Sequence, residues 1–303
     1  VEQDLKTDGM VVTVTFEDES TQTTTAYTLS GYDKKTVGTQ TVTVRYKGFS
    51  DTFDVTVKEA EAVSISGVTV EDKTYDGKPI EYSGTPTSDN YSGDYEYIWE
   101  TADGTVLDSA PINAGNYKLV VKVPSDNLEY VGSTEVSFTI NKANLTITAA
   151  NMSTNVNSVV PAYKFTSSGL VGDDALDTIF SCEYTKDSDV GTYVITPTDC
   201  TFTSGVKNNY NIEYVNGTLS IYGSSYNKTS KTVKIYSKYD TDIDCYIVSY
   251  AENGTLDGIK KEHCSLKADK ISTIDISSLK ISENDSIKIF LWDNNLTPVE
   301  ITN

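Results

Sequence analysis

The stretch Asp189-Val190-Gly191-Thr192-Tyr193-Val194-Ile195 decides the fold. It recurs as Asn113-Ala114-Gly115-Asn116-Tyr117-Lys118-Leu119, and a weaker copy reads Thr36-Val37-Gly38-Thr39-Gln40-Thr41-Val42. The three glycines lie 77 and 76 residues apart. A repeat of this length is typical of one compact all-β module per copy.

Each copy contains the residues of a bend that opens a strand, and we call residues 36–40, 113–117 and 189–193 the corners. Glycine adopts positive φ without steric cost, which suits a chain that turns from one sheet to another. Two residues later stands Gln40, Tyr117 or Tyr193. Such a side chain can pack inward and return a hydrogen bond to the backbone of the bend. Alternating apolar residues then predict a strand.

The spacing of the corners divides the chain of 303 residues into modules. We predict four of them, at residues 1–59, 60–142, 143–222 and 223–303, and the last has no corner. The internal period outranks chain length as evidence for the number of domains. Modules of roughly 60–85 residues bury thin cores.

The first module resembles the group 3 bacterial Ig-like domain. The matching residues are Gly31, Tyr32, Asp33, Val37, Gly38, Thr39, Gln40 and Phe53. That family begins with a strand that would precede Val1. The resemblance therefore implies that the first strand of this module is missing from the sequence.

The second and third modules resemble two further module types of bacterial surface proteins. Residues 73–79, 113–117 and 138–143 look like the YDG-type module. Residues 168–174, 190–193 and 209–221 are similar to the MBG module of surface and adhesin-like proteins.

The fourth module is predicted to have five strands, at residues 231–237, 244–250, 258–266, 272–276 and 287–292. Asn253-Gly254 between the second and third of these is a strong hairpin signal. Segments 247–256 and 287–293 resemble a C-terminal β-sandwich module of secreted clostridial-type proteins.

These resemblances imply an all-β fold class, with four tandem Ig-like β-sandwich modules in an elongated array. The corners are then the counterparts of the tyrosine corner of immunoglobulin sandwiches. The implied localisation is extracellular, at a bacterial cell surface or in a secreted protein. Because the chain starts at Val1 without Met, we expect a fragment of a longer protein.

The charge of the chain excludes some partners. Lys and Arg number 24 and Asp and Glu number 44, a net charge of -20. Nucleic acid binding needs a basic face, and so does docking on anionic lipid. The sequence has no run of about 18 apolar residues, which is the length that predicts a membrane span. The partner is unknown, and the charge is compatible with glycans or proteins of a host or of the cell wall.

The four cysteines could form two disulfides. Cys245 lies nine residues before Gly254 and Cys264 nine residues after Thr255, and Cys182 and Cys200 each lie nine residues from Gly191. Small extracellular modules gain about 2–4 kcal/mol from such crosslinks. Free buried thiols are the alternative. A corner between Cys182 and Cys200 would place their strands in different sheets, which argues against that bridge.

Two sets of aromatic residues could bind a ligand. Tyr95, Tyr97 and Trp99 alternate along one strand face, as a platform for sugar stacking or as part of the sandwich core. Trp292 falls opposite the apolar face of its strand, where a ligand or a neighbouring module could cover it. Core packing and module packing are the simpler alternatives.

The sequence offers little material for a metal or cofactor site. Asp72, Asp76, Asp173 and Asp174 lie in turns without the spacing of a calcium loop, so solvated turns are the simpler interpretation. The single histidine is His263, and no CxxC spacing indicates zinc. We predict no cofactor, no metal site and no catalytic residue, because no triad or phosphate loop is recognisable.

Two functional classes follow, and a third is set aside. The first is a non-catalytic stalk, spacer or adhesin-like part of a bacterial surface protein, which the module resemblances favour. The second is a carbohydrate-binding accessory region of a larger extracellular enzyme, which a set of exposed aromatic rings would favour. The third class is an enzyme in its own right, and no recognisable constellation of residues supports it.

Overall fold

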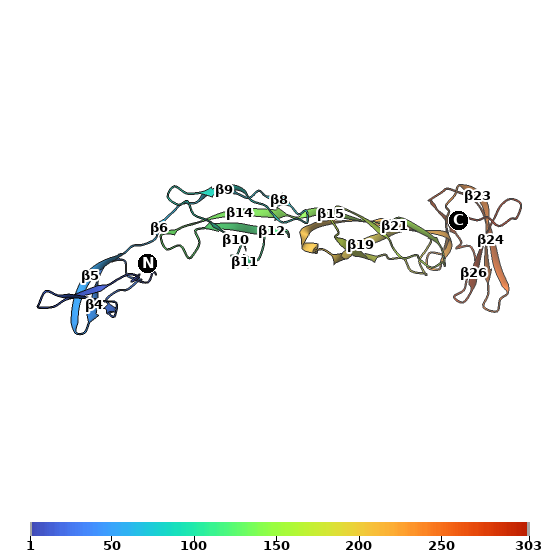
Figure 1. The fold of residues 1–303 in the computed structure, drawn as a ribbon. Helices are drawn as coiled ribbons and strands as arrows, with labels where there is room; N and C mark the ends of the chain where they lie inside the picture. Colours follow the sequence, from blue (N-terminus) through green and yellow to red (C-terminus); the bar gives the residue numbers. More distant parts are fainter. Residues whose placement is uncertain (1, 302–303) are drawn as a thin grey trace. The chain divides into compact units, whose positions relative to one another are not determined.

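The computed structural model describes residues 2–301 of the chain. Within that range one short 3-10 helix, η1 (Lys207–Asn209), accompanies 26 strands, so the predicted all-β fold class is confirmed. The chain forms two compact units, one ending at Asn141 and the other starting at Lys142 (Figure 1). The division into four modules stays a prediction.

Residues 2–59 of the first unit form two small sheets. One is the hairpin β1–β2, and in the other β4 lies between β3 and β5. Val42 and Val44 of β4 and Val57 of β5 are the buried apolar residues of these strands. The strands are β1 (Val12–Thr15), β2 (Thr21–Thr24), β3 (Thr28–Ser30), β4 (Gly38–Tyr46) and β5 (Phe49–Val57).

The rest of the first unit centres on a five-stranded sheet of order β11-β10-β12-β14-β8. Leu119, Val121, Phe138 and Ile140 are buried on one face of it. The pairs β7–β9 and β6–β13 complete this part. Its strands are β6 (Glu61–Ala62), β7 (Ser66–Thr69), β8 (Lys73–Thr74), β9 (Ser83–Thr87), β10 (Glu96–Thr101), β11 (Val106–Leu107), β12 (Gly115–Lys122), β13 (Tyr130–Val131) and β14 (Ser133–Asn141).

The second unit begins with a sandwich. A three-stranded sheet of order β17-β15-β20 accompanies a larger sheet of order β18-β19-β21-β22-β25, and β16 also pairs with β21. Leu145, Ile147, Ile195 and Leu219 are almost fully buried within it. The strands are β15 (Ala143–Ala149), β16 (Met152–Asn155), β17 (Phe165–Ser168), β18 (Ala175–Ser181), β19 (Gly191–Ser204), β20 (Tyr210–Val215) and β21 (Gly217–Asn227).

Strand β21 belongs to two parts of this unit at once. Residues Gly217 to Ile221 pair with β19, and residues Gly223 to Asn227 pair with β22. The boundary predicted between residues 222 and 223 therefore falls inside a continuous strand, and no linker separates the two parts.

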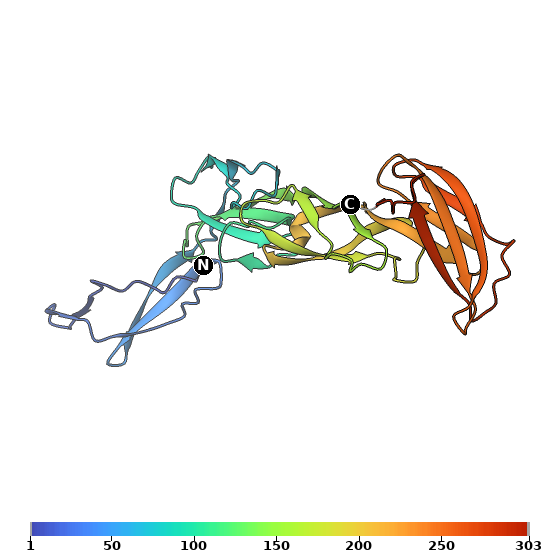
Figure 2. The same cartoon turned by 90° about the vertical axis from the view of Figure 1, so that its right-hand side faces the viewer.

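The C-terminal part of the second unit has all five predicted strands, and they match β22 to β26. In one layer β22 pairs with β25, and in the other β23 lies between β24 and β26. Figure 2 shows the latter three strands, in orange and red, side by side. The strands are β22 (Thr232–Tyr236), β23 (Thr241–Tyr250), β24 (Leu256–Leu266), β25 (Ile271–Asp275) and β26 (Ser286–Trp292).

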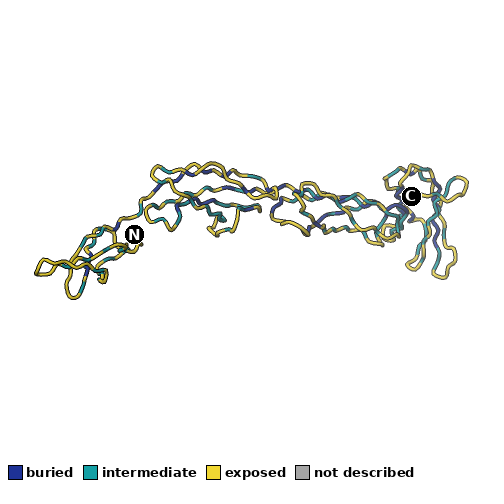
Figure 3. The backbone as a smooth tube through the Cα atoms, in the orientation of Figure 1, coloured by how far each residue is buried: buried dark blue, intermediate teal, exposed yellow. Residues whose placement is uncertain are grey.

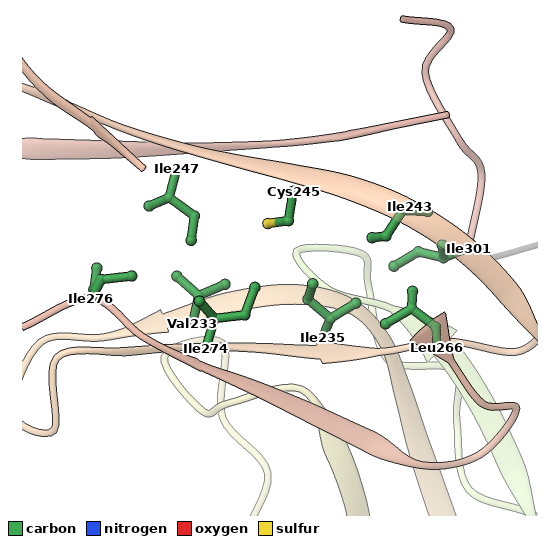
Figure 4. Packing of buried hydrophobic residues seen from close by; sticks show 9 residues of the cluster. All are labelled: Val233, Ile235, Ile243, Cys245, Ile247, Leu266, Ile274, Ile276 and Ile301. Carbon is green, nitrogen blue, oxygen red and sulfur yellow. The ribbon is translucent and has the colours of Figure 1, made fainter. Parts of the chain in front are cut away.

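An apolar core joins these two layers. Ile243, Cys245 and Ile247 of β23 point toward the side chains from β22 and β25 (Figure 4). Val233 and Ile235 are fully buried there. Along the strands buried and exposed residues alternate (Figure 3), which is the pattern of sandwich layers that face a core on one side and water on the other. Among residues 2–301 there is no helix of the length and apolarity that crossing a bilayer requires.

Candidate functional site

The corners make the hydrogen bonds that their sequence predicts. The Tyr193 hydroxyl donates to the carbonyl oxygen of Asp189, and the Tyr117 hydroxyl donates to that of Asn113 at 3.0 Å. Gln40 Nε2 donates to the carbonyl oxygen of Thr36. In all three copies the side chain reaches the carbonyl four residues earlier, so the repeat is one structural device.

The corners nevertheless differ from the expected sheet switch. β3 and β4 are neighbours in one sheet, β11 and β12 flank β10 in one sheet, and β18 and β19 are neighbours in one sheet, so none of the three corners leads from one sheet to another. Gly38 and Gly191 have positive φ, at 119° and 139°. Gly115 is not among the positive-φ glycines, and a Cβ there would lie 3.0 Å from the Tyr117 hydroxyl. That glycine makes room for the ring of its own corner.

The third corner is tied to the C-terminal part of its unit by Asp189. Its Oδ2 lies 2.7 Å from Lys234 Nζ of β22, and its Oδ1 accepts a hydrogen bond from the Ser225 hydroxyl of β21 at 3.1 Å. Asn227 donates to the same carboxylate at 3.3 Å. Burial works to raise the pKa of Asp189, but the hydrogen bonds from Lys234 and Asn227 outweigh it and the pKa is lowered. The carboxylate is therefore a charged structural anchor.

Of the three aromatic residues predicted to share a strand face, Trp99 packs on the core, whereas Tyr95 and Tyr97 pair with neighbouring tyrosines. Trp99 meets the buried Phe138 edge to face, with ring centroids 5.7 Å apart. Tyr97 stacks on Tyr82 at 4.9 Å with an interplanar angle of 24°. Tyr95 meets Tyr91 at 5.2 Å and 86°. All three rings are half-buried, and Tyr95 lies just before the first residue of β10. No sequence pattern indicates Tyr82 and Tyr91, because neither stands on a strand with alternating apolar residues.

Trp292 is half-buried on the outer face of the C-terminal sheet. Its ring lies 5.1 Å from that of Tyr246 and 5.7 Å from that of Phe290. Lys261 covers the Tyr246 ring at 5.3 Å and also binds Asp244 at 2.7 Å. Since its neighbours already cover part of Trp292, local packing accounts for this ring.

The cysteines are all free thiols in the structure. Cys245 is directly opposite Glu262, and Cys264 is directly opposite Ile243. The two cysteines are therefore diagonal neighbours, for which about 7–8 Å is typical, whereas bridged cysteines have Cα atoms about 4.4–6.8 Å apart. The predicted bridge is out of register by two residues. Burial raises the pKa of Cys245 to about 12.

Cys182 and Cys200, whose bridge the corner between them argued against, are also not opposite one another. Cys200 lies opposite Thr178, whereas Cys182 follows the end of β18 at Ser181. Gly191 opens the part of β19 that pairs with β21 and is not the centre of the β18–β19 hairpin. The two strands do share a sheet, so the register, and not a sheet switch, separates these cysteines.

The turn aspartates that the sequence singled out serve the fold. Asp72 accepts a hydrogen bond from the Thr139 N–H at 2.6 Å, and Asp76 pairs with Lys73 at 2.7 Å. The Tyr210 hydroxyl lies at 2.5 Å from Asp174 Oδ2, whereas Asp173 is exposed. Among the described residues no three or more His, Cys, Asp and Glu side chains gather as metal ligands would. His263 lies beside Asp244 at 3.1 Å.

Likeness to solved structures is weak. A three-Ig I-band fragment of titin, I67–I69, has 11% identity and a TM-score of 0.23, with 72% of this chain and 84% of that chain covered. A SusE-like surface-located polysaccharide-binding protein from Bacteroides thetaiotaomicron has 8% identity and a TM-score of 0.16, with 75% of this chain and 62% of that chain covered. No curated protein matches the chain.

Two segments of the chain match models of domain families. Residues 1–57 match the bacterial Ig-like domain (group 3), and residues 145–220 match the MBG domain (YGX type). The expected YDG-type and clostridial-type resemblances have no such match. Where the chain is matched, it is therefore similar to two kinds of module that are typical of bacterial surface proteins.

Proposed function

We propose that this chain is a non-catalytic spacer of an extracellular bacterial surface protein. Its task is to hold another part of that protein at a distance with little bending. The observation that carries the proposal is the continuity of β21, which pairs with β19 and then with β22 without a linker. A strand common to both parts leaves no flexible residues at which they could hinge.

The side chains around this junction support the same role. Tyr222 of β21 stacks on Tyr236 of β22, and Asp189 of the third corner binds Lys234 of β22. Between the two compact units, only Lys142 separates the end of β14 at Asn141 from the start of β15 at Ala143. Short connections restrict motion between domains more than long polar linkers do.

Small-angle scattering of the full chain tests this proposal. A compact domain of 303 residues would have a radius of gyration of about 19 Å. A spacer predicts a value at least about 1.5 times larger, together with the scattering profile of a stiff rod. Six Gly and Ser residues inserted after Lys142 should then broaden the distribution of distances. A compact particle would refute the proposal. So would scattering that indicates a flexible chain before the insertion and does not change after it.

A further inference from the structure

A groove lies beside the first residues of β10 in the first unit. Its volume is about 630 Å³, within the range of about 300–1,000 Å³ of small-molecule sites. The lining comes from the end of β9 and from the segment that leads into β10. It comprises residues 85–88, residues 91–95 and Tyr97.

One wall of the groove is a tyrosine that the protein holds in place. The Tyr91 hydroxyl donates to the carbonyl oxygen of Asp94 at 2.7 Å. The ring lies 5.2 Å from that of Tyr95 and 5.4 Å from that of Tyr130. A Cβ at position 93 would lie 2.6 Å from the Tyr91 hydroxyl, so Gly93 lets the ring lie against the backbone. A ring fixed in advance loses little conformational entropy when a ligand binds.

The other rings of the groove are also supported from behind. Tyr97 is backed by the stacked ring of Tyr82. Among residues 2–301, the Tyr95 hydroxyl is one of two buried side-chain polar atoms without a hydrogen-bond partner. Buried polar groups are almost always paired, so this hydroxyl marks a wall of the groove in which a polar partner is lacking.

The remaining lining groups define the chemistry of a ligand. Thr85, Thr87, Ser88 and Ser92 provide hydroxyl groups, and Asp94 provides the one charged side chain, a carboxylate. No lysine or arginine lines the groove, and the chain as a whole carries a net charge of -20. Aromatic faces suit the C–H faces of sugar rings, hydroxyls and a carboxylate suit sugar hydroxyls, and the negative charge disfavours acidic glycans.

We propose that this groove binds a neutral oligosaccharide, with a pyranose ring against Tyr91 and its hydroxyls bonded by Asp94 and the neighbouring Ser and Thr side chains. This site is independent of the spacer role, since a stiff spacer needs no ligand. It also differs from a platform on Trp99, whose ring packs on Phe138 in the core.

Calorimetric titration of the full chain tests the proposal. The probes are cellotetraose, xylotetraose, mannotetraose and β-1,4-galactotetraose, with a galacturonate oligomer as the acidic counterpart. We expect at least one neutral probe to bind, and the galacturonate oligomer to bind more weakly or not at all. Tyr91→Ala should weaken binding at least about tenfold, as truncation of a central aromatic contact does.

Three further variants separate binding from folding. Asp94→Ala alters an exposed residue and should weaken binding several-fold with an unchanged circular dichroism spectrum. Gly93→Ala should displace the Tyr91 ring and weaken binding as well. Tyr239→Ala, at an exposed tyrosine of the second unit, should leave affinity unchanged. Absence of binding by all four neutral probes at millimolar concentration, or wild-type affinity in both Tyr91→Ala and Asp94→Ala, would overturn the proposal.

Discussion

The ring of Tyr222 lies parallel to that of Tyr236, with centroids 5.0 Å apart and an interplanar angle of 8°. Both rings are buried, and the Tyr222 hydroxyl donates to Asp269 Oδ1 at 2.6 Å. This stack lies where β21 leaves its pairing with β19 and begins its pairing with β22. It therefore packs a ring of β22 against the core of the preceding sandwich, in addition to the ion pair of Asp189 with Lys234.

Replacement of Tyr222 should uncouple the two parts of the second unit. Tyr222→Ala removes a buried ring, and we expect a loss of about 3 kcal/mol in the free energy of unfolding. Urea denaturation, followed by tyrosine fluorescence and circular dichroism, should then show a broader transition for this unit. Tyr222→Phe retains the stack, loses only the hydrogen bond to Asp269 and should cost about 1 kcal/mol. Equal losses in both variants would mean that the stack contributes nothing.

Acid should weaken the same junction through Asp189. Its pKa is lowered in the folded chain, because the hydrogen bonds from Lys234 and Asn227 outweigh the effect of burial. The stabilisation that this carboxylate supplies is complete above its unfolded pKa of about 3.9 and is lost as the pH falls through the lower folded value. Asp189→Asn should therefore cost about 1–2 kcal/mol at pH 7 and much less near pH 2.

Denaturant titrations of the wild-type chain and of Asp189→Asn at several pH values measure this difference. Asp173→Asn, at an exposed carboxylate of the same unit, is the matched control and should change little at any pH. If Asp189→Asn costs as much at pH 2 as at pH 7, the ionised carboxylate is not the source of the stabilisation.

The thiols should remain separate even in oxidising solution. Neither predicted pair is in register, and Cys245 and Cys200 are buried. We expect reduction to leave the mass of the native protein unchanged and alkylation of the unfolded chain to add four labels. In the native state, the half-buried Cys182 and Cys264 should react before the buried Cys200 and Cys245, because a reagent reaches their sulfur atoms more easily. Burial raises the pKa of Cys245 to about 12 and also raises that of Cys264, which slows both thiols because only the thiolate is nucleophilic. A mass increase on reduction would contradict this.

The sequence predicted what depends on local patterns. Glycine followed two residues later by a hydrogen-bonding side chain located the three corners, and alternation of apolar residues located β22 to β26. Both signals lie within a few neighbouring residues. They need no knowledge of what pairs across the sheet.

Features that depend on register could not be predicted in this way. The pairing of Ile243 with Cys264, and not of Cys245 with Cys264, is set by where the hairpin turn is centred, and a shift of one residue in that centre moves the partner by two. The passage of β21 from β19 to β22 has no local sign, because Gly223 between two strand-like runs equally predicts a linker. The groove could not be predicted, because the contact between Tyr91 and Gly93 depends on the conformation of a loop.

The three corner glycines should respond differently to alanine. Gly38 has φ of 119° with open space around it, so Gly38→Ala should show backbone strain alone, about 1–2 kcal/mol. Gly191 has φ of 139°, and a Cβ there would lie 3.1 Å from Ile271 Cδ1, so the loss should be larger, up to about 3 kcal/mol. At Gly115 the obstacle is the Tyr117 ring, because the backbone there is not in the positive-φ region.

Double-mutant cycles distinguish these causes. In a Tyr117→Ala background the cost of Gly115→Ala should nearly disappear, since the ring that it would displace is gone. In a Tyr193→Ala background the cost of Gly191→Ala should persist, since φ and the Ile271 contact do not depend on that ring. Free energies of unfolding from denaturant titration give both coupling terms. Equal coupling in the two cycles would show that the glycines of the second and third corners serve the same purpose, contrary to their backbone conformations.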